Sequence, residues 1–207
     1  MDAALRAGIA IHNAGHHHAA HDAWEDEWLA LDDGTPDERL LHGLVQFTAA
    51  LHHARGRNWA GAVGLCESAR EYLADLPADH RGVNVAAVRT FLQRLGDDPE
   101  RVERRPVLAL TVDGDALELE DLGPRAAVAA AVVLAEHLGY EGERFAAAAE
   151  YAREGLAGDE YNEFAALLCD FTTGDGQRAL VATRLGQHVQ RRQRREADVA
   201  GLFDERT

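Results

Sequence analysis

One local signal constrains the fold of this chain more than any other: the segment Thr35-Pro36-Asp37-Glu38. Threonine is a good N-cap, proline fits the first helical position, and a glutamate three residues after the cap completes a capping box. A helix over residues 36–54 is therefore expected. A second amphipathic pattern covers residues 16–31 and ends at Asp32-Asp33-Gly34. Because so short a loop joins the two helices, they must lie antiparallel and pack face to face.

Helical patterns with their own start and stop signals cover most of the remaining chain, at residues 3–12, 59–76, 84–95, 124–138, 141–156, 160–171 and 177–202. Residues 107–120 instead alternate with period two around Asp113-Gly114, which predicts one β-hairpin that must pack on helices. The expected fold class is therefore all-α, mainly a helical bundle, with one small β-hairpin near residues 107–120. A polar stretch at residues 96–105 divides a helical domain, 1–96, from a helical extension, 97–207, and we expect the two to pack as one globule.

The chain is strongly acidic: it has 36 acidic residues against 21 basic ones and a formal net charge of -15. This balance argues against non-specific attraction to nucleic acid or to anionic membranes. All the basic residues are arginine, and the chain has no lysine. Acidic, arginine-only surfaces are typical of proteins from extreme halophiles, where salt screens charge over roughly 3 Å at 1 M. An alternative source of the arginine bias is a GC-rich genome, which would not explain the acid excess.

The two cysteines, Cys66 and Cys169, are far apart, and neither belongs to a CxxC pair of the kind found in zinc knuckles and redox sites. No apolar run approaches the roughly 18 residues of a membrane helix, and the N-terminus lacks the layout of a signal peptide. A cytoplasmic location is therefore expected.

Several spaced motifs resemble the family catalogued as domain of unknown function 309, a small helical bundle. The matching segments are His12-Asn13-Ala14-Gly15, His21-Asp22-Ala23-Trp24-Glu25 with Trp28, Leu41-His42-Gly43-Leu44-Val45-Gln46, His53, Gly56-Arg57-Asn58 and Gly61-Ala62. Three residues depart from the family pattern, since His12 stands for an aromatic residue, Asp22 for a glutamate and His42 for a glutamine.

The resemblance covers residues 3–95 and implies the helical bundle of that family. It implies no mechanism, because the family has no assigned activity. The C-terminal half looks like the extension of haloarchaeal members, which agrees with the salt-adapted interpretation of the composition.

Helical spacing brings the polar residues of the first helix pair onto facing stripes. His17, His21, Glu25 and Trp28 follow at steps of four, four and three and share one face of the helix over residues 16–31. On the helix over residues 36–54, the same spacing aligns His42 with Gln46 and His53. The predicted binding residues are therefore His17, His21, Glu25, Trp28, Gln46 and His53.

Within this set, His21, Glu25 and His53 are candidate metal ligands, because imidazole and carboxylate groups from facing helices can hold a divalent transition metal in a bundle. A coordination position left open on that metal would activate water, as in a metal-dependent hydrolase. The segment lacks the Glu-x-x-His pairs of di-iron bundles and the His-Glu-x-x-His of zinc proteases.

The alternative to a metal site is a structural network. In that arrangement His21 donates a hydrogen bond to Glu25 or Gln46, and Trp24 and Trp28 fill the core with their indole N–H groups satisfied nearby. No cofactor is then expected. The corresponding function is a non-enzymatic module that binds another protein or a small molecule in the groove between the first two long helices.

An arginine cluster on the last helix, at Arg184, Arg191, Arg192, Arg194 and Arg195, reverses the charge of the chain locally. Nucleic acid is one candidate partner, but the cluster lacks interleaved aromatic residues and the chain as a whole is acidic. A solvated face, or contact with the acidic surface of another subunit, fits the composition better. Alanine-rich faces such as residues 126–131 would allow close helix packing within the chain or across a homodimer.

Overall fold

The computed structural model describes the backbone of residues 1–204 and the side chains of residues 1–199. The chain forms two compact units, and the boundary between them lies between Leu122 and Gly123. The predicted division at residue 96 differs from this one by the hairpin segment, which belongs to the first unit. Among the described residues, every helix is too short or too polar to cross a membrane.

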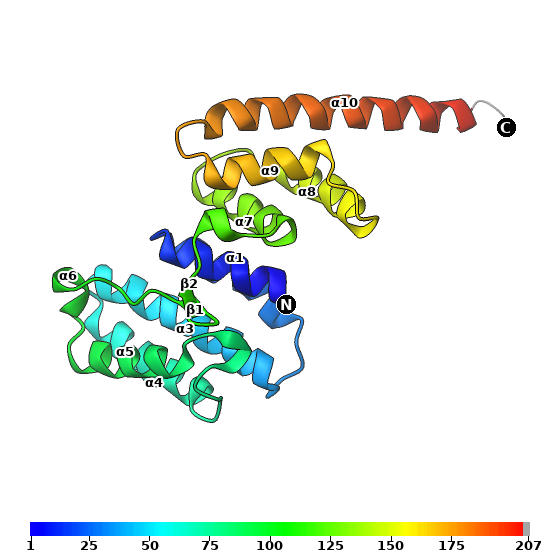
Figure 1. The fold of residues 1–207 in the computed structure, drawn as a ribbon. Coiled ribbons are helices and arrows are strands. Elements are labelled where there is room, and N and C mark those ends of the chain that lie inside the picture. The colour runs from blue at the N-terminus through cyan, green and yellow to red at the C-terminus, as the bar shows by residue number, and fades with distance from the viewer. Residues whose placement is uncertain (205–207) are drawn as a thin grey trace. The chain divides into compact units, whose positions relative to one another are not determined.

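The first unit contains six helices and one hairpin, shown in blue to green in Figure 1. These elements are α1 (Asp2–Asn13), α2 (His17–Leu29), α3 (Pro36–Arg55), α4 (Trp59–Leu73), α5 (Val85–Asp97), the short α6 (Arg101–Arg104), β1 (Thr111–Val112) and β2 (Asp115–Ala116), with 3-10 turns at His80–Gly82 and Leu119–Asp121. The mainly α fold with one small hairpin is confirmed.

The hairpin is shorter than the sequence predicts. β1 and β2 pair antiparallel, with Thr111 opposite Ala116, and Asp113 and Gly114 between them both have positive φ. Both central residues of a type I′ turn require this conformation. The expected flanking residues leave the ladder because side chains of other elements bind their backbone: Asn13 donates to the carbonyl oxygens of Leu110 and Leu117 and accepts from the Leu110 amide.

Two glycines allow helices of the first unit to approach closely. A Cβ atom at Gly8 of α1 would collide with the ring of Trp24 in α2, and one at Gly43 of α3 would lie 2.6 Å from the Leu73 side chain of α4. Trp24 and Leu73 are fully buried. The three helix pairs α1–α2, α2–α3 and α3–α4 therefore form a continuous core.

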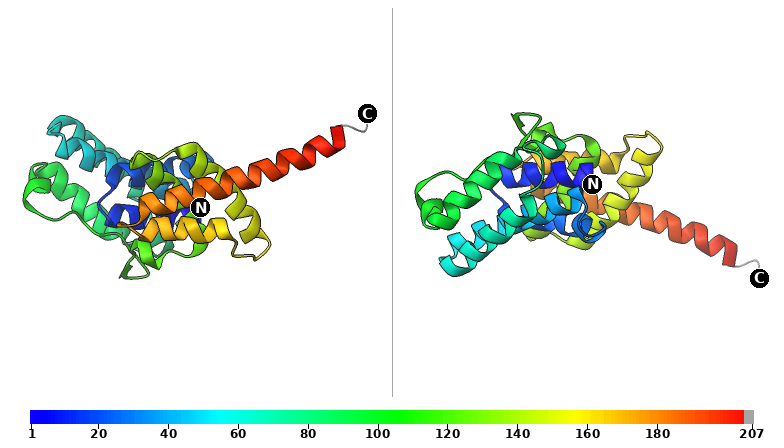
Figure 2. Two further views of the ribbon diagram at one scale, coloured as in Figure 1. Left: turned by 90° about the horizontal axis from the view of Figure 1, so that it is seen from above. Right: turned by 90° about the horizontal axis from the view of Figure 1, so that it is seen from below.

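The second unit is a group of four helices, α7 (Pro124–His137), α8 (Gly142–Ala157), α9 (Glu163–Thr173) and α10 (Arg178–Asp204). Its core includes Phe145 and Phe171, with ring centroids 4.5 Å apart. Val181, Leu185 and Val189 bury one stripe of α10. Residues 190–199 are exposed, and Figures 1 and 2 show this part of α10 extending beyond α8 and α9.

Candidate functional site

The two tryptophans of α2 serve different parts of the first unit. Trp24 is fully buried and donates its indole N–H to the Leu5 carbonyl oxygen at 3.3 Å, so it belongs to the core. Trp28 is only half-buried and donates to Glu38 Oε1 on α3 at 2.9 Å. The indole N–H of Trp28 therefore links the end of α2 to the start of α3.

Glu38 is the centre of a polar network at the start of α3. It is 6% exposed and accepts hydrogen bonds from Trp28 Nε1, from His42 Nδ1 at 3.0 Å and from the Gly34 amide at 3.3 Å. Burial raises the pKa of this carboxyl group, but the three donors outweigh burial and hold the pKa below its usual value. Glu38 is therefore a fixed, buried anion.

The predicted capping box is half formed. Thr35 Oγ1 accepts from the Glu38 amide at 3.3 Å, as the motif requires. The Glu38 carboxylate accepts from Gly34 and from the two aromatic side chains instead of closing the box on the Thr35 amide. The same residue thus caps α3 and binds α2.

His42 lies between two aromatic rings. Its ring centroid is 4.2 Å from that of Trp28 and 3.6 Å from that of Tyr72 on α4, and the Tyr72 ring is stacked on it. Gln46 Nε2 lies 3.5 Å from His42 Nε2 and extends the network one turn along α3. The three rings of Trp28, His42 and Tyr72 therefore join α2, α3 and α4 on one side of the unit.

Glu38 and the three rings of Trp28, His42 and Tyr72 line a groove of about 630 Å³. Its walls are formed by the end of α2, the loop after it, the start of α3 and one face of α4: Trp28, Leu29, Leu31, Asp33, Gly34, Glu38, Arg39, His42, Ser68, Glu71 and Tyr72. The volume is within the range of about 300–1,000 Å³ typical of small-molecule sites.

A buried histidine pair lies at the other end of α2, where the helix begins. His17 Nδ1 is 3.0 Å from His12 Nδ1, and both side chains are at most 7% exposed. Burial lowers the pKa of His12 to about 4 and that of His17 to about 3, with smaller effects from nearby positive charge. His17 is therefore part of the core, where its ring pairs with that of His12.

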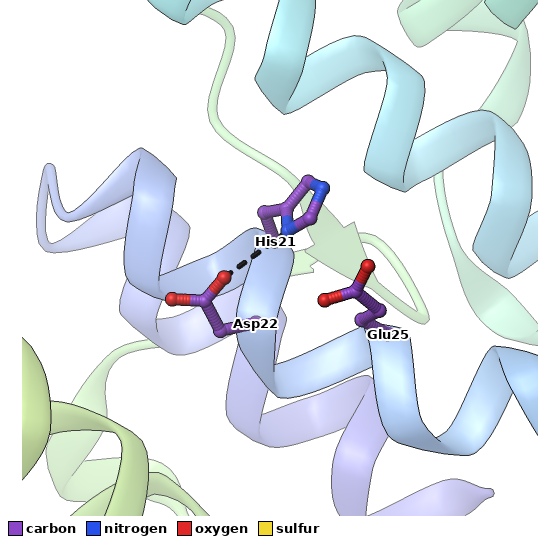
Figure 3. A group of neighbouring side chains, drawn as sticks. All are labelled: His21, Asp22 and Glu25. Atoms are coloured by element: carbon purple, nitrogen blue, oxygen red, sulfur yellow. Dashed lines mark hydrogen bonds and ion pairs between the residues drawn. The ribbon is translucent and has the colours of Figure 1, made fainter.

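A group of three potential metal ligands lies on α2, with Asp22 exposed and His21 and Glu25 half-buried. His21, Asp22 and Glu25 each offer one ligand atom, and these atoms all lie within 4.8 Å of one another. His21 Nδ1 is 3.1 Å from Asp22 Oδ1, and Figure 3 shows this contact with the Glu25 carboxylate one turn further along α2. The hydrogen bond expected from His21 to Glu25 or Gln46 thus goes to Asp22, because the short side chain of Asp22 reaches the neighbouring ring.

His53 does not belong to this ligand group. It lies near the end of α3, and its Nδ1 atom is 2.7 Å from Nδ2 of Asn58, the residue that caps α4. His53 shares with His21 a small cavity of about 130 Å³, which is also lined by His18, Thr48, Ala49 and His52. Tetrahedral coordination at about 2.0–2.1 Å needs ligand atoms roughly 3.4 Å apart, so a metal would require side-chain rotation even within the group on α2.

The comparison with known families gives one match. Residues 5–65 match the family described as domain of unknown function (DUF309). The resemblance to DUF309 is confirmed over these residues. No curated protein matches the chain.

The DUF309 segment contains all six predicted binding residues but only part of the groove. Trp28 and Gln46 belong to the network around Glu38 and His42, whereas His21 and Glu25 lie together on α2. His53 lines a small cavity with His21, and His17 lies in the core. In the sequence, Glu38 is recognisable only as part of a helix cap. No local pattern marks Tyr72, which lies outside the DUF309 segment. The position of Glu38 four residues before His42 was the one signal that could have indicated their contact.

Proposed function

We propose that this protein is a non-enzymatic binding module that holds a small molecule in the groove between α2, α3 and α4. The observation that carries the proposal is the groove itself, which combines aromatic walls with a fixed carboxylate inside a volume suited to a small ligand. Trp28 and Tyr72 supply apolar contact area, and Glu38 with His42 supplies oriented polarity.

Binding fits this groove better than catalysis because its polar groups already bind one another. Glu38 accepts from three donors, and His42 Nδ1 is one of them. A general base needs an atom within hydrogen-bond reach of the proton that it removes. Groups held in this way provide a rigid surface for recognition.

A fragment screen by protein NMR tests the proposal. We expect saturable shifts of the Trp28 indole signal and of amides around Tyr72 when fragments are added to the full chain. Tyr72→Leu should weaken binding by about tenfold or more, because aromatic anchors dominate such sites. Tyr161→Leu, at an exposed tyrosine of the second unit, is the matched control. A library that shifts no groove signal in the wild-type protein would contradict the proposal.

A metal-dependent hydrolase is the second candidate, and the ligand group on α2 favours it. His21, Asp22 and Glu25 would bind a divalent transition metal, which would then activate water. Metal analysis of protein prepared without added metal tests this function. The geometry predicts that Asp22→Asn abolishes stoichiometric metal binding and that His53→Ala leaves it unchanged. A wild-type protein that contains no zinc, manganese or iron as prepared, and binds none when these metals are added, would rule the site out.

We propose that this module works in the cytoplasm of a salt-adapted cell. The acidic, lysine-free composition supports this proposal. Repulsion within a chain of charge -15 weakens as salt rises. The free energy of unfolding should therefore increase between 0.1 and 2 M KCl, as measured by urea titration at fixed pH. A decrease would contradict salt adaptation.

A further inference from the structure

The groove presents aromatic faces with an electronegative character. Trp28, His42 and Tyr72 lie in a row along its wall, with successive ring centroids 4.2 and 3.6 Å apart. Tyr72 is stacked on His42, and the Trp28 ring is tilted against His42 by 42°. The face of an aromatic ring attracts a cation within about 6 Å of its centroid, and tryptophan is the strongest of these rings. The wall of the groove is therefore suited to positive charge.

The charged residues of the groove add to this preference. Asp33, Glu38 and Glu71 line it, against the single cation Arg39. The Arg39 guanidinium is already bound, since it pairs with Asp75 at 3.0 Å and donates to the carbonyl oxygens of Tyr72 and Glu71. Among the described side chains, neither Asp33 nor Glu71 has an ion-pair partner. The groove thus carries negative charge without a free counter-charge.

Glu38 makes part of that negative charge permanent. Its carboxylate is held by Trp28, His42 and Gly34 at the base of the network, so it needs no rearrangement when a ligand arrives. A pre-oriented charge costs little conformational entropy on binding. This fixed carboxylate and the aromatic faces would both repel an anionic ligand.

The lip of the groove is apolar. Leu29 is 68% exposed, and Leu31 lines the groove beside it. An exposed leucine at the edge of an aromatic site can cover methyl or methylene groups of a bound molecule. This edge favours a cation with hydrocarbon substituents over a hydrated inorganic ion.

We infer that the ligand of this groove is a small organic cation, and that a methylated ammonium group fits its aromatic faces and carboxylates best. The inference rests on the proposed binding function and specifies its ligand class. The cationic group lies against the row of rings formed by Trp28, His42 and Tyr72, and Asp33 and Glu71 balance its charge.

Three probes of similar shape and different charge test the inference on the full chain. They are choline, the neutral 3,3-dimethyl-1-butanol and the anion 3,3-dimethylbutyrate, each followed through the Trp28 indole signal in 1 M KCl, where long-range attraction is screened. We expect choline to bind roughly tenfold or more tightly than the neutral probe, and the anion to bind most weakly. A short peptide with trimethyllysine carries the same headgroup, and tighter binding than choline would assign the cation to a protein partner.

A matched pair of variants on α4 locates the charge effect. Glu71→Gln should weaken choline binding several-fold without changing the affinity for the neutral probe. Glu67→Gln, at an exposed glutamate on the same helix outside the groove, should change neither. Equal or tighter binding of the neutral or anionic probe would overturn the cation inference and leave the binding function standing. A groove that responds to none of the probes and to no fragment would overturn both.

Discussion

His12 and His17 show how one buried contact determines the protonation of two residues. His12 Nε2 lies 2.9 Å from the Leu108 carbonyl oxygen, which can only accept, so Nε2 must carry the proton. In neutral His12 the Nδ1 atom is then an acceptor, and His17 Nδ1 donates to it. A proton on His12 Nδ1 would put two donors face to face, and protonation of either ring would place a positive charge in a buried site. Arg55 and His16 contribute further positive charge near the pair.

This pair predicts a loss of stability in mild acid. The folded pKa values, about 4 and about 3, are below the ordinary value of 6.5, so the unfolded chain binds more protons and stability falls as the pH decreases below 6.5. Each ring should cost about 2 kcal/mol between pH 7.5 and 5. Urea titrations across this range measure the loss. His17→Gln should remove about half of it, and His52→Gln, at an exposed ring, should remove none. A flat profile in the wild type would contradict the pair.

At the scale of the elements, the ends of α4 show which parts of a helix are determined locally. Asn58 caps its start by accepting from the Gly61 amide at 3.1 Å, within the same segment of chain. Its far end depends on distant arginines: Arg39 of α3 binds the carbonyl oxygens of Glu71 and Tyr72, and Arg89 of α5 binds that of Leu73. Local signals therefore place the start of α4, and tertiary contacts complete its end.

Two glycines of adjacent helices predict opposite effects of the same substitution. Gly43→Ala in α3 should destabilise the protein by about 1–3 kcal/mol, because its Cβ would lie 2.6 Å from the buried Leu73 side chain. Gly64→Ala in α4 should stabilise it by roughly 0.5–1 kcal/mol, because that Cβ meets open space and alanine favours the helix. Denaturant midpoints of the two variants give the comparison. A neutral Gly43→Ala would show that α3 and α4 can separate without cost.

For the whole molecule, the hairpin segment decides where the first unit ends. Asn13 at the end of α1 makes three hydrogen bonds to the backbone of Leu110 and Leu117, and His12 makes one to Leu108. Leu110 is fully buried. These contacts join residues that are about a hundred positions apart in the chain, so a unit that ends at residue 96 lacks partners for both side chains.

Truncation predicts the consequence of those contacts. A fragment of residues 1–122 should unfold cooperatively, as seen by circular dichroism in urea. A fragment of residues 1–96 should be less stable by several kcal/mol, since four hydrogen bonds at about 1 kcal/mol each and the burial of Leu110 are lost. The variant Asn13→Ala in the longer fragment should reproduce part of this loss. Equal stability of the two fragments would support the division at residue 96.

The sequence by itself determined the mainly α fold and the hairpin turn at Asp113-Gly114, because caps, glycine stops and periodicity act within a few residues. Its spaced motifs also indicated the resemblance to DUF309, which is confirmed over residues 5–65. It also placed Trp28 and Gln46 on facing helices. Only the tertiary structure decided that Glu38 accepts hydrogen bonds from both Trp28 and His42 and that Tyr72 stacks on His42. It also decided that Asn13 binds the backbone beside the hairpin. These contacts depend on how the helices rotate about their axes and how closely they pack, and the three-dimensional core sets both.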